Sequence, residues 1–274
     1  MSSQRLSLLA VGEAMLDVIV QESASGGRPI HAPIHLDAGG TPVNAALAAA
    51  ALGASAAVCA RVGADPAGAA VRDALEAKGV AAMLAVDATA PTGVFVSVGE
   101  QVATDRGAND LLAPVDFDGL PEHDALLVSG YTFRAATIAA ARHALASSSA
   151  RWRGVDLGGA PPAADPVGAN VLFGTLEELG GGAPDALARE LAEGFEIVVV
   201  KLGADGALIG WGEEQRRLPP ASHQADGAVG AGDALDGGVL AGLARGLGPV
   251  AALELGLTAA AAHIGRRREA LTRP

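Results

Sequence analysis

A glycine-rich tetrapeptide near the end of the chain combines a candidate anion-binding turn with a carboxylate. Gly230-Ala231-Gly232-Asp233 is followed by aliphatic residues whose spacing predicts one apolar helix face: Leu235, Val239, Leu240, Leu243 and Leu247. Bare N–H groups at a helix start can hold a phosphate, because the helix dipole places positive charge there. Asp233 would then stand beside that phosphate, able to accept the proton of an attacking hydroxyl. Aspartate is also common at helix starts, so this motif alone leaves a structural role open.

A second glycine pair lies near the start of the chain. Gly39-Gly40 precedes Thr41-Pro42 and an alanine-rich helical stretch that carries Asn44 in its first turn. An amide beside two glycines that expose the backbone can bind sugar-type hydroxyls as donor and acceptor together. The alternative is a plain Gly-Gly turn with Asn44 as a residue of the helix end. Neither motif alone therefore indicates a function, and their order along the chain is needed to infer one.

Short apolar runs alternate with stretches of helical period along most of the length. This pattern is typical of βα units around a mainly parallel sheet. Helices are predicted from Asp65-Pro66 to Gly79 and over residues 135–147. The predicted buried strands are Leu6–Val11, Ala56–Val62, Ala125–Val128, Arg153–Leu157, Asn170–Phe173 and Ile197–Lys201.

Two segments, residues 13–38 and 92–106, break this alternation. In the second, Val94, Val96 and Val98 alternate with other residues at a period of two, which predicts an exposed strand. Strands outside the βα core can form a small flap over one sheet edge, serving as a lid or as a dimer contact. Since no internal repeat or long linker appears, residues 1–274 are expected to form a single domain with this lid.

Composition excludes several classes of function. The chain has 274 residues with Lys+Arg 19 against Asp+Glu 31, a formal net charge of -12 that repels nucleic acid and anionic membranes. The single cysteine, Cys59, permits no internal disulfide, and Met1–Val11 lacks a signal-type pattern, so a cytoplasmic protein is expected. Arg266, Arg267 and Arg268 end a helical stretch and are interpreted as a solvated face.

Taken in order, the motifs resemble those of a known family. Gly39-Gly40-Thr-Pro-Val-Asn44 and Gly230-Ala-Gly-Asp233 are similar to the two signatures of the ribokinase-type (PfkB) carbohydrate kinases. Val198–Gly206 is similar to the nucleotide-side strand and turn of that family, and Arg106–Asn109 to a segment of its sugar kinases. The resemblance implies a ribokinase-like three-layer α/β/α sandwich with a mainly parallel central sheet and a small β lid.

The resemblance also implies roles for individual residues. Asp233 would be the general base, and Gly230, Ala231 and Gly232 would form the anion hole for the transferring phosphate. The positions that match sugar contacts are Asp17, Gly39, Gly40, Asn44 and Arg106. The positions on the nucleotide side are Lys201, Gly203 and Gly206, together with Gly230 and Gly232. ATP and Mg²⁺ are the implied cofactors, with Glu178 on the metal.

Three departures from the family pattern stand against this assignment. Gly227 and Ala228 occupy positions where the family usually has Asp and Thr, and Asp226 lies one residue early. Thr175 replaces the amide of an Asn-x-x-Glu segment, although Glu178 is kept. Gly158 stands where many sugar kinases have Asn followed by Arg. These changes affect the nucleotide loop, the metal site and the phosphate contacts.

The expected function is an ATP-dependent kinase that phosphorylates a hydroxyl of a monosaccharide such as a ketose, a pentose or a sugar acid. The departures keep one alternative open, a catalytically weak or inactive protein that binds sugar or nucleotide. A nucleoside kinase of the same fold is a further alternative, which the aromatic-poor lid disfavours only weakly. The expected partners are a small sugar and ATP, without nucleic acid or membrane. A homodimer formed through the lid is also predicted.

Overall fold

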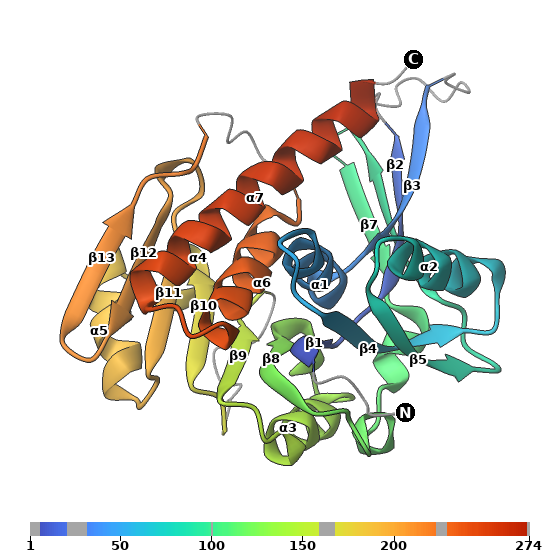
Figure 1. Cartoon of the computed structure of the whole chain (residues 1–274). Helices are drawn as coiled ribbons and strands as arrows, with labels where there is room; N and C mark the ends of the chain where they lie inside the picture. The colour runs from blue at the N-terminus through green and yellow to red at the C-terminus, as the bar shows by residue number, and fades with distance from the viewer. Residues whose placement is uncertain (1–5, 21–31, 100, 159–167, 223–228, 273–274) are drawn as a thin grey trace.

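The computed structural model describes residues 6–20, 32–99, 101–158, 168–222 and 229–272. These residues build a large mixed sheet between two layers of helices, with a second, smaller sheet at one end (Figure 1). The predicted three-layer α/β/α architecture is confirmed. No membrane-spanning helix is found among the described residues.

The large sheet has nine strands in the order β13-β12-β11-β10-β9-β8-β1-β4-β5. Strands from β11 to β5 in this order run parallel, and the β12 and β13 hairpin is antiparallel. Every predicted buried strand is present, with ends that differ by at most two residues. The strands are β1 (Leu6–Val11), β4 (Ala56–Gly63), β5 (Ala81–Asp87), β8 (His123–Ser129), β9 (Trp152–Asp156), β10 (Val171–Thr175), β11 (Ile197–Lys201), β12 (Ala207–Trp211) and β13 (Glu214–Leu218).

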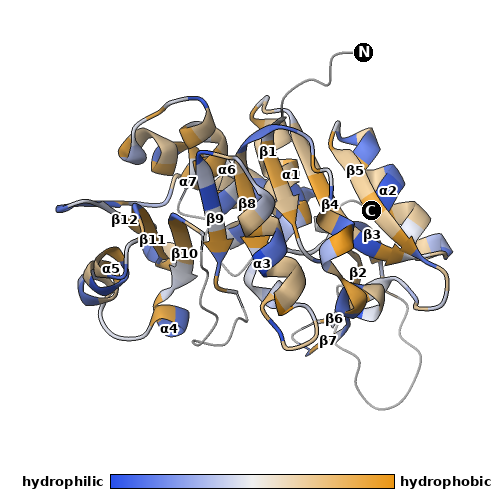
Figure 2. Cartoon of the chain, turned by 90° about the horizontal axis from the view of Figure 1, so that it is seen from below, coloured by the Kyte–Doolittle hydropathy of each residue, from blue (hydrophilic) through white to orange (hydrophobic). Residues whose placement is uncertain are grey.

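Helices cover both faces of the large sheet (Figure 1) because central strands bury apolar side chains on both faces. Figure 2 shows the hydrophobic residues concentrated along these strands. In β11, Val199 packs with the helices of one face, while Val198 packs with those of the other. The first layer holds α1 (Thr41–Ala51), α2 (Pro66–Ala77), α6 (Ala231–Ala244) and α7 (Pro249–Thr272). The second layer holds α3 (Ile138–Ser147), α4 (Leu176–Leu179) and α5 (Ala183–Ala192).

The helix starts follow local chemistry. Asp65 caps α2 as predicted, since its Oδ1 accepts a hydrogen bond from Gly68 N at 2.8 Å. The helix predicted over residues 135–147 begins three residues later, at Ile138. Thr137 N instead donates to Arg134 O at 2.9 Å, which closes a turn before the helix.

The smaller sheet corresponds to the two segments predicted to form the lid. Its order is β3-β2-β6-β7, where β2 is Met15–Val20, β3 Ile34–Gly39, β6 Gly93–Val98 and β7 Gln101–Asp105. Residues 21–31 of the first segment lie outside the described residues. Asp17, Phe95 and Thr104 are paired across three of its strands and therefore share one face of the lid.

The sheet topology sets the position of the site. From β1 the chain continues through the lid to β4 and β5 on one side of β1, whereas β8 to β11 lie on its other side. Ligands of parallel α/β sheets bind outside the carboxyl ends of the strands at such a switch point. Four consecutive strands end at this edge with polar residues, where Ser129 is paired with Asp156 and Thr175 with Lys201, and β10 extends two residues beyond the partner of Asp156.

Candidate active site

A cavity of about 680 Å³ opens at this edge, between the large sheet and the lid. The lid contributes Asp17, Phe95 and Thr104 to its wall, and α7 contributes Leu257 and Ile264. Most residues predicted for the site line this one cavity: Asp17, Gly40, Asn44, Arg106, Glu178, Lys201, Gly203, Gly206, Gly230, Ala231, Gly232 and Asp233. The fold thus brings together residues that lie more than 200 positions apart in sequence.

Gly39 is the predicted site residue that lies outside this lining set. It ends β3 opposite Met15, and a side chain at this position would overlap the carboxylate of Asp17. The backbone of Gly39 therefore packs directly against Asp17, which lines the cavity. Glycine is required here because of this close approach.

The glycine turn and Asp233 are arranged as the sequence predicts. Gly230 has a left-handed backbone (φ 89°) and immediately precedes α6, which begins at Ala231. Asp233 falls in the first turn of that helix. The turn consequently presents backbone N–H groups at the positive end of a helix dipole, in the wall of the cavity.

Asp233 is held from a second helix. Asn44 Nδ2, in the first turn of α1, donates to Asp233 Oδ2 at 2.9 Å. Burial raises the pKa of Asp233 and the negative charge of Asp156 adds to this, while Lys201 and Asn44 act in the opposite direction. A raised pKa suits a carboxylate that must take up a proton.

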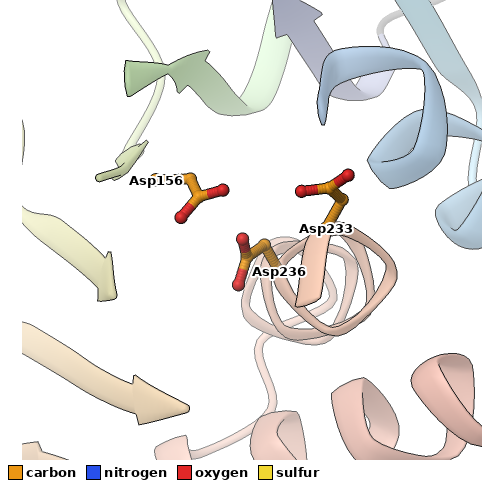
Figure 3. Close-up of side chains that lie close together, drawn as sticks. All are labelled: Asp156, Asp233 and Asp236. Carbon is orange, nitrogen blue, oxygen red and sulfur yellow. The ribbon is translucent and has the colours of Figure 1, made fainter. Parts of the chain in front are cut away.

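Three carboxylates converge beside the turn. Asp233 and Asp236 project from α6 toward Asp156 at the end of β9 (Figure 3), with one oxygen of each within 4.8 Å of the others. Lys201 Nζ lies between two of them, 2.8 Å from Asp156 Oδ1 and 3.0 Å from Asp236 Oδ2. Burial disfavours the charge on Lys201, but these carboxylates outweigh it and raise the pKa of the lysine.

Asp236 is fully buried, and burial raises its pKa. Within the part of the chain that the structure describes, its Oδ1 has no hydrogen-bond partner. Carboxylate oxygens are the ligands that a hard divalent cation prefers, so the donor set of this group fits a cation as well as an ammonium. The sequence analysis did not assign Asp236, although its position one turn after Asp233 places both on one side of α6.

The sugar side of the predicted site contains further buried charge. Burial raises the pKa of Asp17 to about 6; Arg267 opposes this rise, and Asp37 and Asp233 add to it. Arg106 Nε donates to Asp110 Oδ1 at 2.6 Å, which leaves its Nη2 buried and without a partner among the described residues. Arg106 therefore lines the cavity with one donor still free to bind a ligand.

The nucleotide side is built from two strand ends. Gly203 and Gly206 follow β11, and Glu178 lies in the short helix α4 after β10. Thr175 and Glu178 form a capping box, in which Thr175 N donates to Glu178 Oε2 at 2.8 Å. The threonine that replaces the expected amide thus fixes the start of the glutamate helix. Asp226, Gly227 and Ala228 lie outside the described residues.

Glu13 is a residue that the sequence analysis did not assign. Its Oε1 accepts hydrogen bonds from Thr41 N at 3.1 Å and from Ser129 Oγ at 3.0 Å. Burial raises the pKa of Glu13, which is 1% exposed. The signal for it was an acid two residues after a buried strand, because that position lies at the edge of the sheet where ligands bind.

A three-layer sandwich with a β lid over a cavity, and a glycine turn opening a helix there, defines the ribokinase-like kinase fold. The model of the pfkB family of carbohydrate kinases matches residues 5–272, so the chain belongs to this family. No curated protein is similar enough in sequence to match the chain.

Solved structures agree with this fold. An adenosine kinase from Sinorhizobium meliloti is 23% identical with a TM-score of 0.80, the match covering 96% of this chain and 94% of that one. A putative ribokinase II from E. coli, solved with ATP and Mg²⁺, is 19% identical (TM-score 0.78; 95% and 99% covered). A ribokinase from Arabidopsis thaliana, complexed with ribose and ATP, is 20% identical (TM-score 0.74; 99% and 100% covered).

Proposed function

We propose that this chain is an ATP-dependent kinase that transfers the γ-phosphate of Mg-ATP to a hydroxyl group of a monosaccharide. The observation that carries the proposal is the position of Asp233. It follows the glycine turn directly, lies in the same cavity as the lid residues, and is held by Asn44 at 2.9 Å. A base and an anion-binding turn are thereby placed side by side, as phosphoryl transfer to a hydroxyl requires.

In the proposed reaction Asp233 accepts the proton of the sugar hydroxyl as the hydroxyl oxygen attacks the γ-phosphorus. The bond from that phosphorus to the β,γ-bridging oxygen breaks, and ADP leaves. The N–H groups of residues 230–232 donate to the phosphoryl oxygens, whose negative charge the helix dipole also stabilises. Asp17, Gly40, Asn44 and Arg106 hold the sugar in the cavity, with Gly39 behind Asp17. The lid excludes water from the reacting groups.

The nucleotide would bind over the ends of β10 and β11, where Gly203 and Gly206 line the cavity and the side-chain position of Gly203 is open. Glu178 would hold Mg²⁺, whose charge neutralises the phosphates when it is bound. Support for this comes from the carboxylate ligands in the cavity wall and from the E. coli structural neighbour solved with ATP and Mg²⁺.

The decisive experiment measures ADP release with Mg-ATP across ketoses, pentoses, sugar acids and nucleosides. Replacing Asp233 by Asn should lower kcat by about 10²–10⁴, because a general base is lost while the amide keeps the side-chain shape. Asp185→Asn is the matched control, since Asp185 is an exposed first-turn aspartate of α5. Equal kcat for Asp233→Asn and wild type would refute the assigned base. Release only with nucleosides would select the nucleoside kinase, and no release with any acceptor the binding protein.

We also propose that the lid mediates a homodimer. Leu36, Val18 and Val96 are paired across β3, β2 and β6, on the lid face opposite to Asp17 and Phe95. Ile34 and Leu36 on this outer face are 62% and 64% exposed, which is unusual for large aliphatic side chains on one strand. A second copy could cover this face.

Light scattering after size exclusion tests the dimer. Leu36→Lys should shift the wild-type dimer to monomers, because it places a charge in an apolar contact. Val115→Lys is the control, since Val115 is 66% exposed and lies outside the lid. A wild-type monomer at high protein concentration would contradict the proposal.

A further inference from the structure

Helix α7 runs along α6 and reaches the lid with its carboxyl end (Figure 1). It lines the cavity with Leu257, Ala260, Ala261 and Ile264. The arginine run at this end is only in part the solvated face that the sequence suggested. Arg266 and Arg268 are exposed, whereas Arg267 is partly buried and directed inward. This end of α7 therefore takes part in the architecture of the site.

Two side chains of α7 meet at one backbone carbonyl. His263 Nε2 and Arg267 Nη1 each lie 3.0 Å from Val229 O. A carbonyl oxygen only accepts, so His263 must carry its proton on Nε2. The two residues are four positions apart and share one face of the helix. Both lone pairs of this carbonyl are thus engaged from a single rigid element.

Val229 immediately precedes the glycine turn. Since the peptide unit is planar and trans, the N–H of Gly230 points opposite to the carbonyl of Val229. Holding that carbonyl toward α7 fixes this N–H away from α7. The backbone of Gly230 packs closely between α7 and α1, because a side chain there would lie 2.9 Å from His263 Nε2 and 2.8 Å from Asn44 Nδ2.

From this geometry we infer that His263 and Arg267 are positioning residues that hold the turn of residues 230–232 in its phosphate-binding conformation. The inference rests on the proposed function of the turn. Arg267 also places a positive charge close enough to Asp17 to oppose the rise that burial causes in the pKa of that carboxylate. It therefore lies between the phosphate-binding turn and the lid.

The test uses two pairs of variants and a control. Arg267→Met and His263→Leu remove a donor at similar size, while Arg267→Lys and His263→Gln keep an N–H. Arg266→Met removes the same charge from an exposed position of the same helix.

In Arg267→Met and His263→Leu, the loosened turn should lower kcat by about tenfold to a hundredfold, since displacements near 1 Å have effects of that order. The KM for the sugar should change by less than threefold, a rough bound for an unmoved sugar site. Most of the activity should return in the second pair.

A binding measurement separates this inference from the proposed reaction. The affinity for Mg-ADP is compared with and without aluminium fluoride, which fills the position of the transferred phosphoryl group. Wild type should gain affinity with the fluoride; no gain would refute phosphate binding by the turn, and this inference with it. Arg267→Met should lose most of that gain while it binds Mg-ADP alone as wild type does. The positioning role would be overturned if aluminium fluoride raised the Mg-ADP affinity equally in Arg267→Met and Arg266→Met. It would also be overturned if Arg267→Met lowered only the melting temperature and left kcat and this gain in affinity unchanged.

Discussion

At the scale of single residues, burial raises the pKa values of several carboxylates in or beside the cavity wall: Glu13, Asp17, Asp233 and Asp236. Each is placed where ionisation is unfavourable, so each lowers the stability of the folded chain at neutral pH. Of these four carboxylates, only Asp236 has a cationic side chain within hydrogen-bond distance among the described residues, and that cation is Lys201. These carboxylates therefore lower the stability of the fold, and they are available to bind a proton, a metal ion or a substrate.

Asp17 allows this cost to be measured. Its pKa is raised from 3.8 to about 6, so the folded chain binds the proton more tightly than the unfolded chain. That contribution to stability is complete below about pH 4 and is lost as the pH rises through 6. Asp17→Asn should therefore raise the free energy of unfolding at pH 7.5 by up to about 3 kcal/mol and leave it unchanged near pH 4.

Urea unfolding at the two pH values measures this difference. Asp73→Asn serves as the control because Asp73 is exposed on α2. The same Asp17→Asn variant should bind sugar more weakly if Asp17 contacts it. A stability gain that does not depend on pH would show that ionisation of Asp17 is not its cause.

At the scale of elements, the end of β1 completes the start of α1. Gly40 precedes that helix and has no side chain to cap it, so Glu13 Oε1 accepts the hydrogen bond of Thr41 N instead. Asn44 lies in the first turn of α1 and reaches Asp233. The position of Asp233, the proposed base, thus depends on a glutamate outside both helices.

Replacing Glu13 tests this dependence. Glu13→Leu leaves the N–H of Thr41 and the hydroxyl of Ser129 without their acceptor and should lower the free energy of unfolding by about 1–3 kcal/mol. It should also lower kcat, because Asn44 shifts with the helix. Glu13→Gln keeps an acceptor oxygen and removes the buried charge, so at neutral pH it should be at least as stable as wild type in urea unfolding, with a kcat close to that of wild type. Equal losses in both variants would show that the charge, not the hydrogen bond, is what matters.

The elements of this fold were largely predictable, and the contacts between them were not. Short apolar runs predicted β1, β4 and β11, because a strand buried on both faces has an almost continuous apolar sequence. The glycine turn and Asp233 followed from local chemistry at a helix start. The bond between Asn44 and Asp233 and the ion pairs of Lys201 join residues 35 to 189 positions apart, which no local pattern encodes. His263 was missed for the same reason, since its acceptor lies on a different element.

At the scale of the whole molecule, the net charge of -12 opposes the binding of any anionic substrate. In the proposed reaction Mg-ATP approaches a cavity lined by carboxylates, where Arg106, Lys201 and the start of α6 supply local positive charge. Long-range repulsion is screened over a Debye length of about 10 Å at 0.1 M salt, whereas contacts inside the cavity are screened far less. Salt should therefore weaken the repulsion more than it weakens the local attraction.

We accordingly expect kcat/KM for Mg-ATP to rise by about two- to threefold as ionic strength increases from roughly 20 to 200 mM. A neutral sugar supplies the internal control, since its kcat/KM at saturating Mg-ATP should not change. If the physiological acceptor is a sugar acid, its kcat/KM should rise together with that of Mg-ATP, so the same titration reports the charge of the substrate. Steady-state kinetics in a salt whose ions do not bind Mg²⁺ measures all three dependences. A steep fall for Mg-ATP would mean that local cations, and not the net charge, govern its capture.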